Sequence, residues 1–161
     1  EGDTEAGVTF HLCNEKVDSG DVVFQVAFQI AETDTINQLF TKAEDVTAKY
    51  IVSALENWVA GHILKKGERT KHPYASMLSS KTQEIQKDCP PLRLSRISRI
   101  SQPPWPKAFF QHKNQRVEIN TVSPWKENFG WPGDNSVVYG DFVVELQNKA
   151  QANFFRDFVG L

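Results

Sequence analysis

Side chains able to move a proton near neutral pH are few in this sequence, and the four histidines are His11, His62, His72 and His112. None stands at metal-ligand spacing from another histidine, a cysteine or a carboxylate, so the sequence predicts no metal site. His72 is the best candidate for proton transfer, because with Pro73 and Tyr74 it lies in a polar segment expected to form a surface loop. A plain surface histidine is the alternative.

Two groups of residues have the chemistry of a binding surface. Four basic side chains stand close together in sequence, namely Lys65, Lys66, Arg69 and Lys71. Three rings lie in a segment rich in turn formers, namely Trp125, Phe129 and Trp131. We expect these seven residues, with His72 and Tyr74, to contact a protein, a sugar or RNA. The alternative is a solvated basic rim and rings that pin a long loop to the core.

The two cysteines are Cys13 and Cys89. In an oxidising compartment such a pair permits one disulfide, which would stabilise the fold by about 4 kcal/mol through loop closure. The chain begins at Glu1 and has one Met, as a processed, secreted protein or a trimmed chain would. We therefore predict a secreted protein with a Cys13–Cys89 bridge, two buried free thiols being the alternative.

The composition is that of one ordinary folded domain. Its 161 residues are 40% hydrophobic and 24% charged. The formal net charge of -2 gives no general attraction to phosphate backbones. The longest apolar run is far too short for a transmembrane helix, which excludes a membrane-spanning protein. We expect a single domain over residues 1–161, a monomer that needs no cofactor.

Hydrophobic periodicity predicts a hairpin and a helix in the first half. Alternation over residues 8–13 and 22–30 predicts two antiparallel strands, after a frayed start at residues 1–7. Apolar residues in a single stripe predict a helix from Asp45 to about residue 63, capped by Asp45 or Thr47 and ended by Gly67. A shorter stripe over residues 36–43 is a separate turn of helix or an extension of the same one.

The second half is predicted to be mostly strand. Residues 67–91 are polar and predict a long loop. Residues 92–100 and 116–120 have strand character, and a hairpin over residues 137–146 turns at Gly140 and Asp141. On a strand, the arginines at 93, 96 and 99 would not share one face. They are therefore only a weak indication of RNA binding. The fold class is therefore α+β, with one main helix packed on an antiparallel sheet.

The order of these segments resembles the small secreted fungal ribonucleases and the ribonuclease-like effectors of powdery-mildew fungi. The similarity rests on residues 8–13 as an aromatic-x-Cys strand, residues 40–54 as the helix and His72-Pro73-Tyr74 as a reversed Tyr-Pro-His segment. Residues 135–146 resemble the final hairpin, and residues 153–155 resemble its trailing strand. The resemblance implies a ribonuclease-like core.

The same resemblance implies that catalysis has been lost. Glu145 and Leu146 stand where a catalytic His is expected, and Ser136 stands in place of an Arg. The function implied is that of a secreted, non-catalytic effector that binds a host protein or RNA and is recognised by a host immune receptor. One alternative is an active ribonuclease or cytotoxin using His72 with Glu118 or Glu145 as acid and base, and Arg116 on the phosphate. Another is a sugar- or protein-binding module of unrelated α+β fold.

Overall fold

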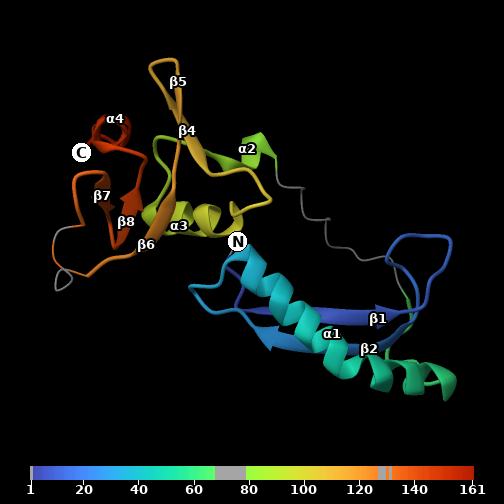
Figure 1. Cartoon of the computed structure of the whole chain (residues 1–161). Coiled ribbons are helices and arrows are strands. Elements are labelled where there is room, and N and C mark those ends of the chain that lie inside the picture. The colour runs from blue at the N-terminus through green and yellow to red at the C-terminus, as the bar shows by residue number, and fades with distance from the viewer. Residues whose placement is uncertain (1, 68–78, 127–129, 131) are drawn as a thin grey trace. The chain divides into compact units, whose positions relative to one another are not determined.

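Contacts within the chain divide it into an N-terminal unit, Gly2–Ser76, and a C-terminal unit, Met77–Leu161 (Figure 1). The computed structural model describes residues 2–67, 79–126, 130 and 132–161. Within this described part, no helix has both the length and the apolar character needed to cross a bilayer. The sequence alone predicts a single domain over residues 1–161, and the contacts within the chain fall into these two units.

The N-terminal unit is an antiparallel hairpin with one long helix on it. Strand β1 (Glu5–His11) pairs with β2 (Val22–Gln29), and helix α1 is Ile36–Val59. Phe24 of β2 stacks on Tyr50 of α1 with ring centroids 5.4 Å apart. The alternation therefore predicts the hairpin correctly, although β1 begins at Glu5, inside the start expected to be frayed.

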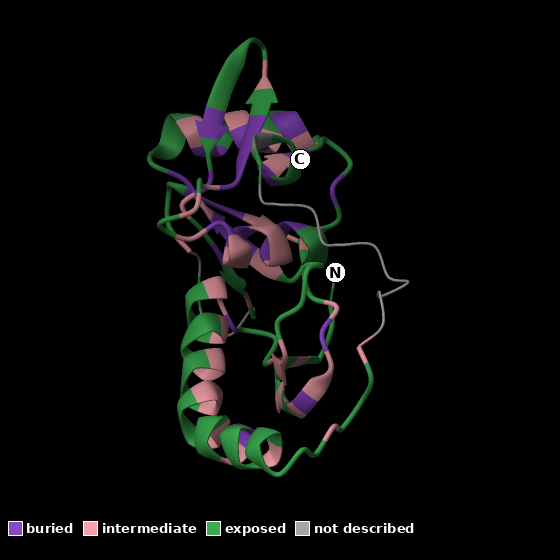
Figure 2. Cartoon of the chain, turned by 90° about the vertical axis from the view of Figure 1, so that its right-hand side faces the viewer, coloured by how far each residue is buried: buried purple, intermediate pink, exposed green. Residues whose placement is uncertain are grey.

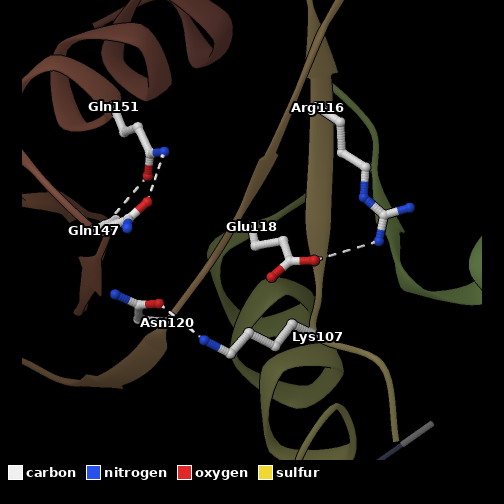
Figure 3. A pocket seen from close by; sticks show the side chains of 6 residues that line it. All are labelled: Lys107, Arg116, Glu118, Asn120, Gln147 and Gln151. Atoms are coloured by element: carbon white, nitrogen blue, oxygen red, sulfur yellow. Dashed lines mark hydrogen bonds and ion pairs between the residues drawn. The ribbon is translucent and has the colours of Figure 1, made fainter.

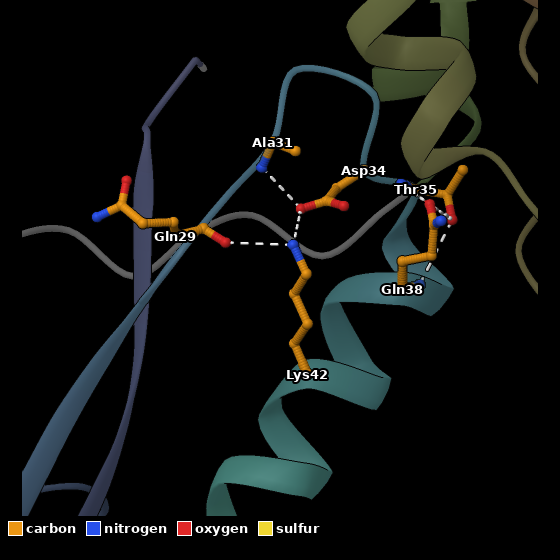
Figure 4. Close-up of polar contacts among 6 residues, drawn as sticks. All are labelled: Gln29, Ala31, Asp34, Thr35, Gln38 and Lys42. Carbon is orange, nitrogen blue, oxygen red and sulfur yellow. Dashed lines mark hydrogen bonds and ion pairs between the residues drawn. The ribbon is translucent and has the colours of Figure 1, made fainter.

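The helix begins nine residues earlier than Asp45, the first residue of the stripe used to predict it. Thr35 caps α1, and its hydroxyl accepts from the Gln38 amide while the Gln38 side chain accepts from the Thr35 amide (Figure 4). Asp34 lies just before this cap and accepts from the Ala31 amide at 2.7 Å and from the Lys42 ammonium. The short stripe over residues 36–43 is therefore the start of α1, and neither Asp45 nor Thr47 caps it.

Residues 79–126, 130 and 132–161 of the C-terminal unit form two three-stranded sheets. In the first, β3 (Glu84–Ile85) is parallel to β4 (Phe109–His112), which is antiparallel to β5 (Gln115–Glu118). In the second, β8 (Phe142–Glu145) lies between β6 (Thr121–Pro124) and β7 (Ser136–Tyr139), all antiparallel. The predicted hairpin at Gly140 and Asp141 is confirmed, since Tyr139 faces Phe142 across β7 and β8.

Three helices complete this unit: α2 (Ser80–Gln83), α3 (Pro91–Ile100) and α4 (Lys149–Val159). The prediction of a strand at residues 92–100 is wrong. Pro91 opens α3 at a position where its missing N–H costs nothing, and Leu94 and Ile97 lie one turn apart on its inner side. The prediction of a trailing strand at residues 153–155 is also wrong, because these residues lie in α4. Asn148 caps this helix, and its side chain accepts a 3.0 Å hydrogen bond from the Gln151 backbone amide.

The expected architecture of one helix on one antiparallel sheet is therefore wrong for the chain as a whole. It describes the N-terminal unit alone. The described part of the C-terminal unit has two sheets, a parallel strand pair and the three helices α2, α3 and α4. The expected and observed architectures differ at residues 92–100 and 149–159. Both segments form helices, since each buries apolar residues with helical spacing.

The largest core lies in the C-terminal unit and centres on Phe110 of β4, which is fully buried. Rings of α4 surround it, with centroids 4.8 Å away for Phe158, 5.4 Å for Phe155 and 6.2 Å for Phe154. Figure 2 shows buried residues gathered on the strands and helices of this unit. The C-terminal helix and the first sheet are therefore held together by one aromatic cluster.

Phe110→Ala is expected to lower the free energy of unfolding by about 3–5 kcal/mol, because it removes a fully buried ring and leaves a cavity. Phe40→Ala is the matched control, since that ring is 52% exposed on α1. Urea denaturation followed by circular dichroism measures both variants. Equal losses for the two would show that Phe110 is not the centre of the core.

Asp157 of α4 gives stability a dependence on pH. Lys113 donates to its carboxylate at 2.6 Å and His112 at 2.9 Å, and these bonds lower the pKa of Asp157 to about 2. Since the folded pKa lies below the usual value of about 3.9, this stabilisation is complete above pH 4 and is lost as the pH falls through 2. We expect Asp157→Asn to reduce the fall of the melting temperature between pH 4 and pH 2. Asp134→Asn should leave this dependence on pH unchanged.

Candidate functional site

The loop between β1 and β2, residues 12–21, is closed tightly at its neck. The Leu12 amide donates to the Asp21 carbonyl at 2.9 Å. Gly20 is buried against this neck, and a Cβ atom there would lie 1.5 Å from the Leu12 carbonyl oxygen. The glycine of the turn cluster at residues 18–21 is therefore required by the close approach of two backbone segments.

Asp21 ties the same loop to the segment that follows α1. Its carboxylate accepts from the Gly67 amide at 2.7 Å and from the Lys66 ammonium at 2.9 Å. The Gly67 amide bond, then the Lys66 bond, lowers the pKa of Asp21. Gly67 also passes so close that a Cβ atom would lie 2.1 Å from the Ser19 carbonyl. The loop is thus held by backbone contacts and one carboxylate.

This closed loop carries Asp18 next to His11. Asp18 has a φ of +51°, in the left-handed region that non-glycine residues rarely occupy. Its carboxylate lies 3.8 Å from Nε2 of His11, whose Nδ1 is 3.1 Å from the Leu12 carbonyl. A bond from Nδ1–H to that carbonyl leaves Nε2 to exchange protons. Both side chains reach solvent, at 30% and 62% exposure, so the pair has the groups needed for proton transfer.

A polar pocket of about 380 Å³ lies in the C-terminal unit (Figure 3). Its lining is two cations, one carboxylate and three amides: Lys107, Arg116, Glu118, Asn120, Gln147 and Gln151. Arg116 and Glu118 alternate on β5 with the buried Val117, which turns both charges outward. The pocket can therefore offer hydrogen-bond donors and acceptors around one carboxylate.

Bonds among the lining residues fix several of these side chains. The Lys107 ammonium donates to the side-chain oxygen of Asn120 at 3.1 Å. The side-chain amide of Gln151 donates to the side-chain oxygen of Gln147 at 3.4 Å. The Arg116 guanidinium lies 3.7 Å over the Phe109 ring and 3.6 Å from the Glu118 carboxylate. The pocket is thus a preformed polar surface whose Arg116 side chain is held by contacts on β4 and β5.

The predicted site residues have different outcomes. Arg116 and Glu118 lie together at the pocket, whereas Glu145 accepts from the Thr121 hydroxyl at 2.7 Å and is not part of its lining. Lys65 pairs through its backbone with Val22. Six predicted residues lie outside the described part of the chain: Arg69, Lys71, His72, Tyr74, Phe129 and Trp131.

Trp125 is half-buried, and its indole N–H lies 3.4 Å from the Gly130 carbonyl. Its backbone amide donates to the Asp141 carbonyl at 2.8 Å, which ties Trp125 to the β7–β8 turn. This position suits a ring that anchors a loop. A role for Trp125 in binding stays a prediction.

The structure holds both cysteines as free thiols in different units, and the Cys13–Cys89 bridge stays a prediction. Cys13 is exposed in the N-terminal unit, and Cys89 is buried in the C-terminal unit, where burial raises the pKa of its thiol. Within residues 2–67, 79–126, 130 and 132–161, no group of three His, Cys, Asp or Glu residues is arranged to hold a metal ion.

The sequence is similar to enzymes that transfer formyl groups. A sequence model described as formyl transferase matches residues 1–55. The methionyl-tRNA formyltransferase of Anaeromyxobacter sp. is 30% identical over 145 residues, which are 87% of this chain and 46% of the relative. That of Marinobacter nauticus is 28% identical over 127 residues, 78% of this chain and 40% of the relative. The chain thus spans less than half the length of these relatives.

Solved structures show the same likeness in fold. Methionyl-tRNA formyltransferase from Clostridium thermocellum matches 90% of this chain and 56% of its own, with a TM-score of 0.64 and 14% identity. The sugar 3N-formyl transferase WlaRD matches 91% of this chain and 57% of its own, at 0.65 and 17%. HypX from Aquifex aeolicus, solved with tetrahydrofolic acid, matches 95% of this chain and 31% of its own, at 0.64 and 18%.

These comparisons overturn the resemblance to secreted ribonuclease-like effectors. The fold neighbours are formyltransferases, so the ribonuclease-like fold class is wrong. The relatives are enzymes, which contradicts a non-catalytic effector, a ribonuclease and an unrelated binding module. The prediction of a host protein or immune receptor as partner is wrong as well, because it depends on the effector resemblance. The motifs that carry the resemblance are short, and one of the elements they imply, the strand at residues 153–155, is part of a helix instead.

Gly20→Ala is expected to open the neck of the loop, because a methyl group cannot fit 1.5 Å from the Leu12 carbonyl. The measurement is amide hydrogen exchange at Leu12, whose N–H bonds to Asp21 across the neck. Exchange should accelerate at least tenfold, as a loss of about 1.4 kcal/mol or more in local stability requires. Val17→Ala, which shortens a side chain that is 79% exposed in the same loop, is the control, and unchanged exchange in Gly20→Ala would refute the packing argument.

Proposed function

We propose that this chain is part of an enzyme that transfers a formyl group to an amine. The observation that carries the proposal is the formyl transferase match to residues 1–55. That segment contains β1, the closed loop and β2. It therefore includes Asp18 and His11, the pair whose geometry suits proton transfer.

Formyl transfer to an amine needs such a pair. The acceptor nitrogen attacks the formyl carbon, and the bond from that carbon to the donor nitrogen breaks. One proton leaves the acceptor nitrogen, and one is added to the donor nitrogen. In the proposed role, the Asp18 carboxylate accepts the first proton, and His11 exchanges protons between Asp18 and the donor. Loop closure by Gly20 and Asp21 holds the carboxylate in place during these steps.

The proposed acceptor is the amino group of methionyl-tRNA, and the proposed donor is a formyl-tetrahydrofolate. The methionyl-tRNA formyltransferases are 28–30% identical to this chain over most of its length. The sugar formyltransferases among the solved structures are 15–17% identical, so they support the fold and not the amino-sugar substrate. Tetrahydrofolic acid and folinic acid are present in two of the solved formyltransferase-fold structures.

The test is transfer of radiolabelled formyl from a formyl-tetrahydrofolate to methionyl-tRNA by the purified chain. Asp18→Asn removes the proton acceptor while keeping the size of the side chain. We expect it to lower the rate by about 100-fold or more. The matched control is Asp45→Asn, which changes an exposed carboxylate on α1 of the same unit.

Two results separate the parts of this proposal. Absence of formyl-methionyl-tRNA with the folded wild-type chain would contradict the proposed function. Transfer that is equally fast with Asp18→Asn would keep the function and refute the role of Asp18.

A further inference from the structure

The segment that follows α1 runs back along the start of β2, beside the closed loop of residues 12–21. Its backbone pairs with Val22, whose amide donates to the Lys65 carbonyl at 2.8 Å and whose carbonyl accepts from the Leu64 amide at 2.8 Å. Lys66 and Gly67 come next and contact the loop itself. The segment thus places two lysines beside the loop, and neither has a part in the proposed proton transfer.

The two lysines make different contacts. The Lys66 ammonium donates to the Asp21 carboxylate at 2.9 Å. In the part of the chain that the structure describes, the Lys65 ammonium has no carboxylate partner. Both side chains are exposed, and an ion pair this exposed contributes little to the stability of a fold. We therefore expect the unit to fold when Lys66 is replaced, and Lys65 offers a matched control.

Asp21 passes the contact with Lys66 on to the loop. Its two carboxylate oxygens accept from different donors, one from Lys66 and the other from the Gly67 amide at 2.7 Å. Its backbone carbonyl accepts from the Leu12 amide at 2.9 Å, across the neck of the loop. Asp21 is therefore bonded through both its side chain and its backbone, which fixes the end of the loop that follows Asp18.

The distance between Asp18 and His11 makes the position of the loop important. The Asp18 carboxylate lies 3.8 Å from Nε2 of His11, which is longer than a hydrogen bond. A proton passes directly between two such groups at about 2.6–3.2 Å, so they have to approach each other. A displacement of about 1 Å can change a rate about 100-fold. A contact that holds the loop can therefore act on the rate without touching a substrate.

We propose that Lys66 is a positioning residue for the formyl transfer. Through Asp21 it holds the closed loop so that Asp18 stays within reach of His11. This role rests on the proposed function, and it belongs to a residue outside the reacting pair. It also separates the two lysines, since the Lys66 side chain bonds to the loop and Lys65 pairs through its backbone alone.

Steady-state kinetics of the full chain, with a radiolabelled formyl-tetrahydrofolate and methionyl-tRNA, test this role. Lys66→Met should lower kcat about tenfold and change KM for either substrate by less than about twofold, because the lost bond positions a reacting group and binds no substrate. Lys66→Arg can still donate to Asp21 and should restore most of the rate. Lys65→Met should match the wild-type chain in both constants.

Amide hydrogen exchange at Gly67 measures the contact of Lys66 with Asp21 in the absence of the reaction. The Gly67 amide donates to the same carboxylate, so Lys66→Met should accelerate its exchange several-fold. Lys65→Met should leave this exchange unchanged. Thermal unfolding followed by circular dichroism should be the same for both variants, because each replaces an exposed side chain.

The outcomes separate the role of Lys66 from the proposed function. Unchanged kcat in Lys66→Met, in a wild-type background that transfers formyl, would overturn the positioning role alone. A higher KM with unchanged kcat would overturn it as well, because Lys66 would then bind a substrate. A lower kcat without faster Gly67 exchange would refute the route through Asp21. Absence of transfer by the folded wild-type chain would contradict the proposed function and, with it, the role of Lys66 in the reaction.

Discussion

Burial of Phe110 among the rings of α4 is the interaction on which most of the C-terminal unit depends. This one ring joins β4 to the last helix, and β4 in turn fixes β3 and β5 on its two sides. Because Val117 of β5 faces the same core, its neighbours Arg116 and Glu118 must face away from it. The polar pocket is thus the outer surface of a strand whose inner surface is fixed by packing.

The N-terminal unit is stabilised in a different way. Among its described residues, the buried apolar side chains are Val23 and Ala54, while α1 leaves Ile51, Leu55 and Trp58 about half exposed. So small a core contributes little free energy for a unit of this length. Its order therefore also relies on the stacking of Phe24 on Tyr50 and on polar contacts such as those of Asp34 and Asp21.

Sequence patterns predict the elements whose signals are local. The β1–β2 hairpin follows from alternation around a turn cluster, and the β7–β8 hairpin follows from Gly140, which has a φ of +59°. Helix α3 was missed because Leu92 and Leu94 alternate with Arg93 as in a strand. The helical spacing of Leu94 and Ile97 behind Pro91 outweighs that alternation, since burial against the neighbouring strands selects the helical face.

The candidate site residues show the same difference between local sequence signals and effects of the folded chain. Residue type alone makes Arg116 and Glu118 candidates, and they share a face because a strand places alternate residues on one side. The sequence does not single out Asp18, because what sets it apart is its backbone, held at a φ of +51° in a loop that closes only where Gly20 leaves room. Neither condition follows from residue type alone. The Asp18 backbone adopts a conformation that costs stability, and a turn with only a structural role could avoid this cost by placing glycine there. Such strain concentrates at functional sites, which is the physical reason for assigning the proposed chemistry to the loop beside His11.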